Sequence, residues 1–307
     1  MSSFLYHNTL LQGETTVNRN EQDVVGSQFC FSEDGEYPLL GADEAFRAWR
    51  LHDTELIAST IMDSVDCLVA SKGGKWIAAK RGGSELVVWD AKTYEEVFSH
   101  EENEGENIHA VDFSPDSSRL VSATSNGIVT IWDLVTCKQV QILLHKPFVF
   151  AVKYSPQGDR IATASSSVRI WDSNNGNLLV DIPVKVTPVY NTGLLWFNTR
   201  IFVVSKDRIK EFDTFTGSMV TELLVPNSNR YSCIALPKRG KFIAYSTGRT
   251  IAFWDTSTHS QLGLIQCPQD VRSVAISPDD QFIAICGEDR KISLSRVTVS
   301  MMSCRTM

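Results

Sequence analysis

Short apolar runs separated by polar turns recur along the whole chain at a nearly constant spacing. Each of these runs leads into an aromatic or aliphatic anchor residue, and successive anchors lie 39 to 43 residues apart. The seven anchors are Trp49, Trp89, Trp132, Trp171, Phe212, Trp254 and Leu294. Runs of four to eight residues bounded by turn residues are typical of β-strands. The pattern therefore predicts an all-β chain built from seven repeats.

A second landmark lies 16 to 19 residues before each anchor, where an apolar strand ends in a polar turn. The copies are at 31–35, 113–116, 154–158 and 276–279, with weaker ones at 70–74 and 236–240 and an eroded one at 196–198. Proline presets the backbone at the first turn position, and Asp or Gly is tolerated at the next ones. Each repeat thus has room for four strands, and four strands in about 40 to 45 residues is the signature of a propeller.

Trp-Asp dipeptides at 89–90, 132–133, 171–172 and 254–255, together with the Ser-Pro turns, make the chain resemble the WD-repeat family from about residue 24 to 295. The resemblance implies a seven-bladed β-propeller of four-stranded antiparallel blades that serves as a platform for protein partners. We expect residues 1–307 to form a single propeller. The arm at 1–23, through its strand at 4–11, is expected to close the ring, with 296–300 as the competing segment.

One departure from the family concerns a hydrogen-bonded set that joins a His, a Ser or Thr, a loop Asp and the anchor Trp. His145 is the one histidine at the family's position, and its repeat carries three serines, 165–167, where the Asp is expected. The sequence therefore predicts that no complete set forms. Apolar packing between blades is expected to carry most of the stability.

Composition excludes several classes of protein. The chain is 43% hydrophobic and 21% charged with a net charge of -7, which argues against affinity for phosphate backbones. Its apolar runs fall short of the roughly 20 residues that cross a bilayer. The seven cysteines lie at least 18 residues apart, so neither a zinc site nor a disulfide framework is predicted. We expect a monomer in the cytoplasm or nucleus that binds neither nucleic acid nor membrane directly.

Motifs that carry chemistry are missing from the sequence. It contains no glycine-rich phosphate loop, no metalloprotease helix and no nucleophile elbow. We therefore expect no cofactor, no metal and no catalytic residue. Asp112 and Lys153 occupy equivalent positions in neighbouring repeats. They are predicted to form an ion pair, and a catalytic acid in the central channel is the alternative.

Candidate binding residues lie where the chain enters the first strand of each repeat, because partners in the family often dock on that face. The candidates are Asp66, His109, Phe148, Phe150, Arg230 and Arg272. Aromatic and Arg side chains dominate the energetics of interfaces, so Phe148 and Phe150 rank first. The acidic run 101–106 enters the third repeat and is either a solvated loop or a docking patch for a basic partner.

Three functions remain open at this stage. The first is a non-catalytic platform for one or more proteins or peptides, as a scaffold or as the sensor module of a larger assembly. The second is a chromatin- or ubiquitin-associated adaptor that reads a basic peptide. The third is a propeller enzyme with carboxylates in its channel, because a fold does not determine a function.

Overall fold

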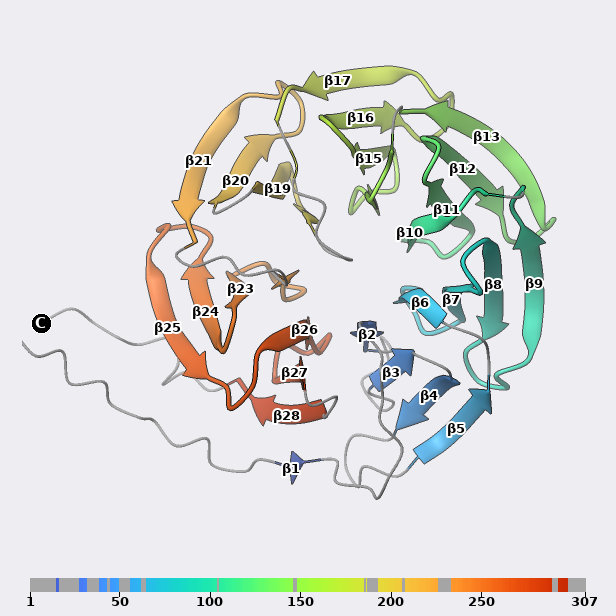
Figure 1. Ribbon diagram of the computed structural model, residues 1–307. Coiled ribbons are helices and arrows are strands. Elements are labelled where there is room, and N and C mark those ends of the chain that lie inside the picture. The colour runs from blue at the N-terminus through green and yellow to red at the C-terminus, as the bar shows by residue number, and fades with distance from the viewer. Residues whose placement is uncertain are drawn as a thin grey trace, which may run out of the picture.

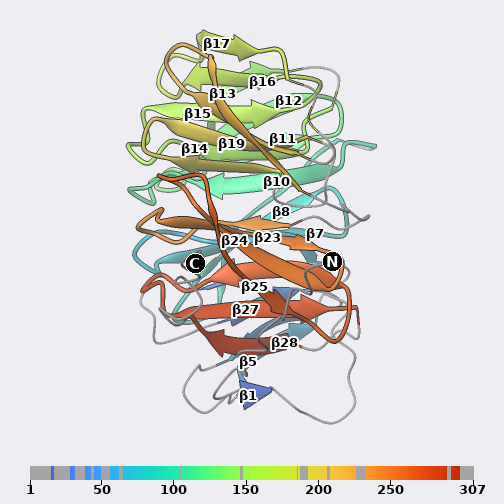
Figure 2. The ribbon, with the colours of Figure 1, turned by 90° about the vertical axis from the view of Figure 1, so that its left-hand side faces the viewer.

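The computed structural model describes residues 15–16, 28–31, 39–42, 45–49, 56–61, 65–103, 105–145, 148–184, 186, 193–205, 208–225, 233–288 and 292–297. Their strands form seven four-stranded sheets, each with antiparallel neighbours. The sheets stand around a common axis, with one strand of each near the axis and the last at the circumference (Figure 1). The side view shows the sheets next to one another along the ring (Figure 2).

Six blades consist of four consecutive strands each, and we number them in chain order. Blade 1 has β2 (Gln28–Cys30), β3 (Leu39–Ala42), β4 (Ala45–Trp49) and β5 (Leu56–Ile61). Blade 2 has β6 (Val65–Ala70), β7 (Trp76–Arg81), β8 (Glu85–Asp90) and β9 (Glu96–Glu101). Blade 3 has β10 (Ile108–Phe113), β11 (Arg119–Thr124), β12 (Ile128–Asp133) and β13 (Lys138–Leu144).

The next three blades repeat this order. Blade 4 has β14 (Ala151–Tyr154), β15 (Arg160–Ala164), β16 (Val168–Asp172) and β17 (Leu178–Ile182). Blade 5 has β18 (Leu194–Phe197), β19 (Arg200–Ser205), β20 (Arg208–Asp213) and β21 (Met219–Leu224). Blade 6 has β22 (Ile234–Ala235), β23 (Phe242–Thr247), β24 (Thr250–Asp255) and β25 (Gln261–Gln266).

The remaining sheet differs from these six blades. It contains three consecutive strands, β26 (Val271–Ile276), β27 (Phe282–Gly287) and β28 (Ile292–Arg296), and its fourth strand is β1 (Thr15–Thr16) from the other end of the chain. The prediction of a seven-bladed ring of four-stranded blades was therefore wrong in the number of complete blades, which is six among the described strands. Six blades are complete from consecutive strands, and the ring is closed by a composite sheet whose outer strand has only two residues.

The segment that was expected to close the ring, 4–11, lies outside the described residues, as does 298–300 of the competing tail. The strand that pairs with β28 is β1, with Thr15 opposite Leu294. Pairing with a strand from the opposite end of the chain covers an edge that the composite sheet would otherwise expose.

Hydrogen bonds at the predicted Ser-Pro turns explain why the chain reverses there. The Ser114 hydroxyl accepts a bond from the backbone N–H of Arg119 at 2.9 Å, and Ser155 accepts one from Arg160 at 3.0 Å. Ser277 repeats the arrangement with Phe282 at 2.8 Å. Each bond spans five residues, so the serine fixes the width of the turn between the first two strands of its sheet.

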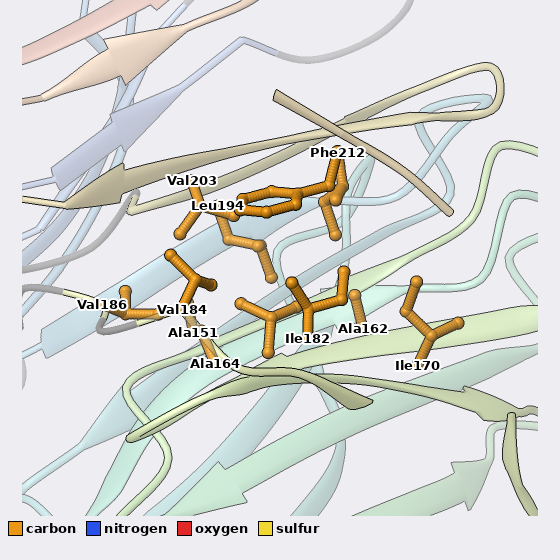
Figure 3. Close-up of a cluster of buried hydrophobic side chains, with 12 residues drawn as sticks. Ala151, Ala162, Ala164, Ile170, Ile182, Val184, Val186, Leu194, Val203 and Phe212 are labelled. Carbon is orange, nitrogen blue, oxygen red and sulfur yellow. The ribbon is translucent and has the colours of Figure 1, made fainter. Parts of the chain in front are cut away.

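Apolar packing between neighbouring blades forms the core. One cluster joins blades 4 and 5, where Ile170 and Ile182 face Leu194, Val203 and Phe212 across the gap between the sheets (Figure 3). Similar clusters join the other neighbouring sheets around the ring. Burial of these side chains on both faces of each sheet explains why a blade is stable only beside its neighbours.

The hydrogen-bonded set predicted to be incomplete is in fact closed in blade 4. The His145 ring contacts the Thr163 hydroxyl through Nδ1 at 2.7 Å and the Ser167 hydroxyl through Nε2 at 3.3 Å. The indole N–H of Trp171 donates to the same Thr163 hydroxyl at 2.8 Å. Ser167 thus takes the place in which an Asp was expected. In blade 3 only part of the set remains, as Trp132 donates to Ser122 at 2.9 Å.

Candidate partner-binding site

The ring has two chemically distinct ends. At one end the chain enters the first strand of each sheet, and we call it the entry end; for β10 this is Ile108. At the other end each first strand runs into its polar turn, and we call it the turn end; for β10 this follows Phe113. Four of the six predicted binding residues lie near the entry end of blades 2 to 4: Asp66, His109, Phe148 and Phe150.

Three predicted residues form an aromatic cluster at the entry end. The ring of His109, on β10, lies 4.4 Å from the ring of Phe148, measured between centroids. The Phe148 ring lies 5.7 Å from that of Phe150, in the segment that leads into β14. All three side chains are half-buried. We name His109, Phe148 and Phe150 the entry-end aromatic cluster; it bridges blades 3 and 4.

The cluster is anchored from both sides. The Cys67 thiol of β6 donates to the backbone carbonyl of His109 at 2.8 Å, which ties blade 2 to blade 3. Phe150 packs against the apolar cluster between blades 4 and 5. Phe148 is thus held between two fixed rings while part of its surface stays accessible, as expected of an interface anchor.

The acidic loop 101–106 is attached to the same end of blade 3. The Glu106 carboxylate accepts a hydrogen bond from the Asn126 amide at 2.5 Å and one from Asn103 at 3.3 Å. The backbone N–H of Asn107 donates to Ser125 at 3.1 Å. Glu106 precedes His109 by three residues along the chain, so the acidic run leads into the strand that carries the cluster. Whether the run is a solvated loop or a docking patch stays a prediction.

Burial shifts the pKa values of two side chains in and beside this loop, Glu102 and His100. The Glu102 side chain is 8% exposed, and its Oε2 lies 3.9 Å from His100 Nε2. Burial, and secondarily the charge of Glu106, raises the pKa of Glu102 above its ordinary value. Burial likewise lowers the pKa of His100. A cationic side chain brought to this loop would relieve the repulsion between the two carboxylates.

The other predicted residues do not join the aromatic cluster. Asp66 lies on β6, opposite Lys80 of β7. Arg272 is half-buried on β26, and β2 and β6 lie between β26 and β10 on the shorter way around the axis. Arg230 lies outside the described residues. Sequence analysis missed Asn126, although its position just before the Trp strand signals that it faces the entry loop.

The predicted pair in the channel is confirmed. Lys153 Nζ lies 2.8 Å from Asp112 Oδ1, and the other carboxylate oxygen accepts the backbone N–H of Tyr154 at 2.8 Å. Both oxygens are thus engaged in binding blade 4 to blade 3. This geometry favours a structural ion pair over a catalytic acid, which needs a proton and an open approach to substrate.

Other chemistry is sparse in the part of the chain that the structure describes. No group of three or more His, Cys, Asp or Glu side chains there is arranged to hold a metal ion. The six cysteines in that part form no disulfide bond with one another, and burial raises the pKa of Cys30 and of Cys233 to about 12, which makes both thiols poor nucleophiles. No described helix is long and apolar enough to cross a membrane.

The family model for "WD domain, G-beta repeat" matches residues 94–133, 137–172 and 260–294. Each matched segment includes the outer strand of one sheet and the first three strands of the next, as β9 to β12 for 94–133. A repeat therefore straddles two sheets. This offset explains why the last sheet lacks an outer strand from its own end of the chain and takes β1 instead.

Curated relatives share the repeats at low identity. The serine-threonine kinase receptor-associated protein of Gallus gallus is 23% identical over 192 residues, covering 60% of this chain and 53% of the relative. The Dictyostelium discoideum protein of that name is 22% identical over 77% of this chain and 74% of the relative. The Periodic tryptophan protein 2 homolog of Dictyostelium discoideum is 24% identical, covering 80% and 28%. The chain thus spans 53% and 28% of the first two relatives' own lengths.

A solved structure shares the architecture. The β-propeller domain of Myceliophteria_thermophila Cps50 (Swd1) superposes with a TM-score of 0.79 at 16% identity, covering 93% of this chain and 100% of that one. At this identity the likeness concerns the fold. Together with the matched repeats and the relatives, it leads to one conclusion: the chain carries WD repeats at 94–133, 137–172 and 260–294 and folds as a β-propeller.

Proposed function

We propose that this propeller is a non-catalytic platform for protein partners and that its main docking site is the entry-end aromatic cluster. The observation that carries the proposal is the stack of His109, Phe148 and Phe150 beside the acidic loop. Half-buried aromatic side chains on a rigid scaffold are the residues that contribute most to binding energy in interfaces. In this proposal the negative charge comes from Glu106, which accepts a hydrogen bond from Asn126 and precedes His109 by three residues along the chain.

This arrangement favours a basic peptide segment as the occupant. A Lys or Arg side chain can lie over the face of Phe148 while its charge meets Glu106, and cation–π contacts of this kind contribute about 0.5 to 2 kcal/mol. The second candidate function is therefore a chromatin- or ubiquitin-associated adaptor that reads a basic peptide. The relatives' names, among them a kinase receptor-associated protein and the human Pre-mRNA-processing factor 17, are compatible with a role in protein assemblies.

The setting proposed for this function is the cytoplasm or nucleus, with the ring acting as a monomer and with neither nucleic acid nor membrane as a direct partner. The net charge of -7 supports this, because phosphate backbones and anionic lipids both select basic surfaces. An enzymatic function receives no support from the channel, where Lys153 and the Tyr154 N–H engage both oxygens of Asp112.

Affinity purification with quantitative mass spectrometry tests the proposal. Phe148→Ala is compared with Phe215→Ala, which removes an equally large ring that is 60% exposed in the turn after β20. We expect a set of proteins that bind the wild type and Phe215→Ala at low ionic strength but are lost with Phe148→Ala. A correctly folded Phe148→Ala variant that retains every partner would contradict the proposed site.

A further inference from the structure

Among the described residues, the loop between blades 2 and 3 has a buried carboxylate oxygen that accepts no hydrogen bond. Glu102 directly follows β9, its side chain is 8% exposed, and the unpartnered atom is its Oε1. Its Oε2 lies 3.9 Å from Nε2 of His100, but burial lowers the pKa of that ring and keeps it neutral at pH 7. A buried charge without compensation is costly. Glu102 therefore carries a charge that the described side chains leave uncompensated.

Three other carboxylates, each at the end of the third strand of its blade, show the contrast. Hydrogen bonds from backbone N–H groups lower the pKa values of Asp90, Asp133 and Asp213. These three carboxylates are thus stabilised in their charged form by the fold itself. At Glu102 the direction is reversed, because burial and then the charge of Glu106 raise the pKa. This is the behaviour of two carboxylates held near each other with no cation between them.

The loop is fixed to a turn on either side of it. The backbone N–H of Glu102 donates to the carbonyl of Ser84, in the turn between β7 and β8, at 3.0 Å. The N–H of Asn107 donates to the hydroxyl of Ser125, between β11 and β12, at 3.1 Å. One end of the loop is thus held by blade 2 and the other by blade 3. Because both ends are held before a ligand arrives, binding here costs little conformational entropy.

A reversal inside the loop brings the second carboxylate toward the first. Gly105 adopts a φ of +86°, a conformation that favours glycine, and the backbone N–H of Glu106 donates to the carbonyl of Asn103 at 3.0 Å. The side-chain amides of Asn103 and Asn126 each donate to one carboxylate oxygen of Glu106. These bonds fix the Glu106 carboxylate beside the neighbour of Glu102. Each of its oxygens keeps a lone pair that a cation can use.

The available donor atoms select the kind of cation. Glu102 and Glu106 offer carboxylate oxygens, and Asn103 offers its amide oxygen, because its amide nitrogen is the group that donates to Glu106. In the part of the chain that the structure describes, no three His, Cys, Asp or Glu side chains converge, and zinc sites use at least three such ligands. Calcium instead accepts carboxylates together with amide oxygens, main-chain carbonyls and water in a flexible geometry, whereas magnesium demands a strict octahedron.

We propose that Glu102 and Glu106 bind one calcium ion, with neutral oxygens and water completing its coordination shell. The ion supplies the positive charge that the buried Glu102 carboxylate lacks, and it stabilises the connection between blades 2 and 3. With two charged ligands the site is weak, with a Kd of about 10⁻⁴ to 10⁻³ M. The inference does not depend on the entry-end aromatic cluster.

Terbium luminescence with calcium as competitor tests the proposal. Terbium(III) replaces calcium on oxygen ligands and emits when a nearby indole is excited, and the Trp132 ring lies 4.4 Å from that of His100, measured between centroids. We expect saturable emission from the wild type that calcium displaces at least about tenfold more effectively than magnesium. Glu102→Gln should weaken calcium binding at least about tenfold, because it removes one of two charged ligands.

The matched control is Glu101→Gln, which makes the same change in net charge at the exposed neighbouring residue and should bind calcium within about twofold of the wild type. Calcium should also raise the melting temperature of the wild type and of Glu101→Gln but not that of Glu102→Gln. Without calcium, Glu102→Gln should melt no lower than the wild type, because it removes an uncompensated charge. The proposal is overturned if calcium does not displace terbium from the wild type, if magnesium competes equally, if both variants lose binding equally or not at all, or if calcium-free Glu102→Gln melts lower.

Discussion

The entry end and the turn end of this propeller are made by the same repeats, yet they differ in what stabilises them and in what they can bind. At the entry end, blade 4 is held by the buried His145 set, and the surface combines aromatic rings with carboxylates. At the turn end, the buried hydroxyls of Ser114, Ser155 and Ser277 donate to nearby aspartates and fix three of the turns, and the surface there includes aromatic rings and lysines.

Contacts between blades follow the same division. At the turn end, Arg119 donates to the carbonyl of Ser173 at 3.2 Å, and Arg160 donates to that of Thr214 at 3.2 Å while its guanidinium lies 4.0 Å from the centroid of the Phe215 ring. Each arginine therefore links a blade to the next one through a half-buried bond. The same repeat can thus be held by a buried hydrogen-bonded set at one end and by arginine contacts between blades at the other.

The largest expected effect comes from the buried set. His145→Ala removes two hydrogen bonds and leaves a cavity at a fully buried position, so we expect a loss of about 3 kcal/mol in the free energy of unfolding. Ser155→Ala removes the hydrogen bond that the Arg160 N–H donates at one turn, and it should lower the free energy of unfolding by about 1 kcal/mol. Chemical denaturation measures both. Equal losses in the two variants would remove the proposed difference between the ends.

Acid should weaken the entry end first. Burial lowers the pKa of His145 to about 4 from the ordinary 6.5, so the unfolded chain binds the proton more readily. The stability contributed by neutral His145 is present above pH 6.5 and falls with pH until about 4. The expected loss is about 2 kcal/mol by about pH 5. A Ser114 hydrogen bond lowers the pKa of Asp116 below 3.8, so the turn end loses its contribution only in stronger acid.

Denaturation of wild type and His145→Gln over this pH range separates the two contributions. The variant carries no titrating ring at this position, so its stability should depend less on pH between 6.5 and 4 than that of the wild type. Parallel pH profiles for the two proteins would show that His145 does not cause the acid sensitivity.

A pair of glycines tests how closely blades 5 and 6 pack at the turn end. Gly240→Ala should cost about 2 kcal/mol, because it combines left-handed backbone strain with displacement of the Phe197 ring. Gly105→Ala, in the acidic loop at a φ of +86° with open space around it, should cost about 1 kcal/mol. Chemical denaturation measures both losses. Equal losses in the two variants would show that the contact with the Phe197 ring adds nothing to the backbone strain.

The smallest change in stability is expected for the binding residues themselves. Phe148 is half-buried and contributes to no buried cluster of the described core, so Phe148→Ala should change the free energy of unfolding by less than about 1 kcal/mol. Thermal melting checks this. A loss of several kcal/mol would mean that Phe148 fills the gap between blades 3 and 4 rather than serving partners.

Periodicity predicted much of the fold, because an anchor every 39 to 43 residues is imposed by the geometry of stacked sheets. It could not predict the composite closing sheet in detail, since the two residues of β1 carry no hydrophobic pattern. It also missed the closed set in blade 4, because Ser167 replaces the expected Asp with a shorter side chain that still reaches His145.

The site residues were harder to predict for a different reason. His109, Phe148 and Phe150 come together because blades 3 and 4 are adjacent, and this follows from the repeat order. Arg272 was grouped with them by its equivalent position in the repeat, but equivalent positions surround the axis and most are not neighbours. A cavity at the turn end was not predicted, because it is lined by the turns of five blades, each contributing one or a few residues.

The most direct test of the entry-end site is a calorimetric titration of the ring with the basic peptide acetyl-KKFKK-amide at low ionic strength. We expect saturable binding that weakens at least about tenfold in Phe148→Ala and stays within about twofold of the wild type in Phe215→Ala. No saturable binding to the wild type, or equal losses in the two folded variants, would contradict the proposed site.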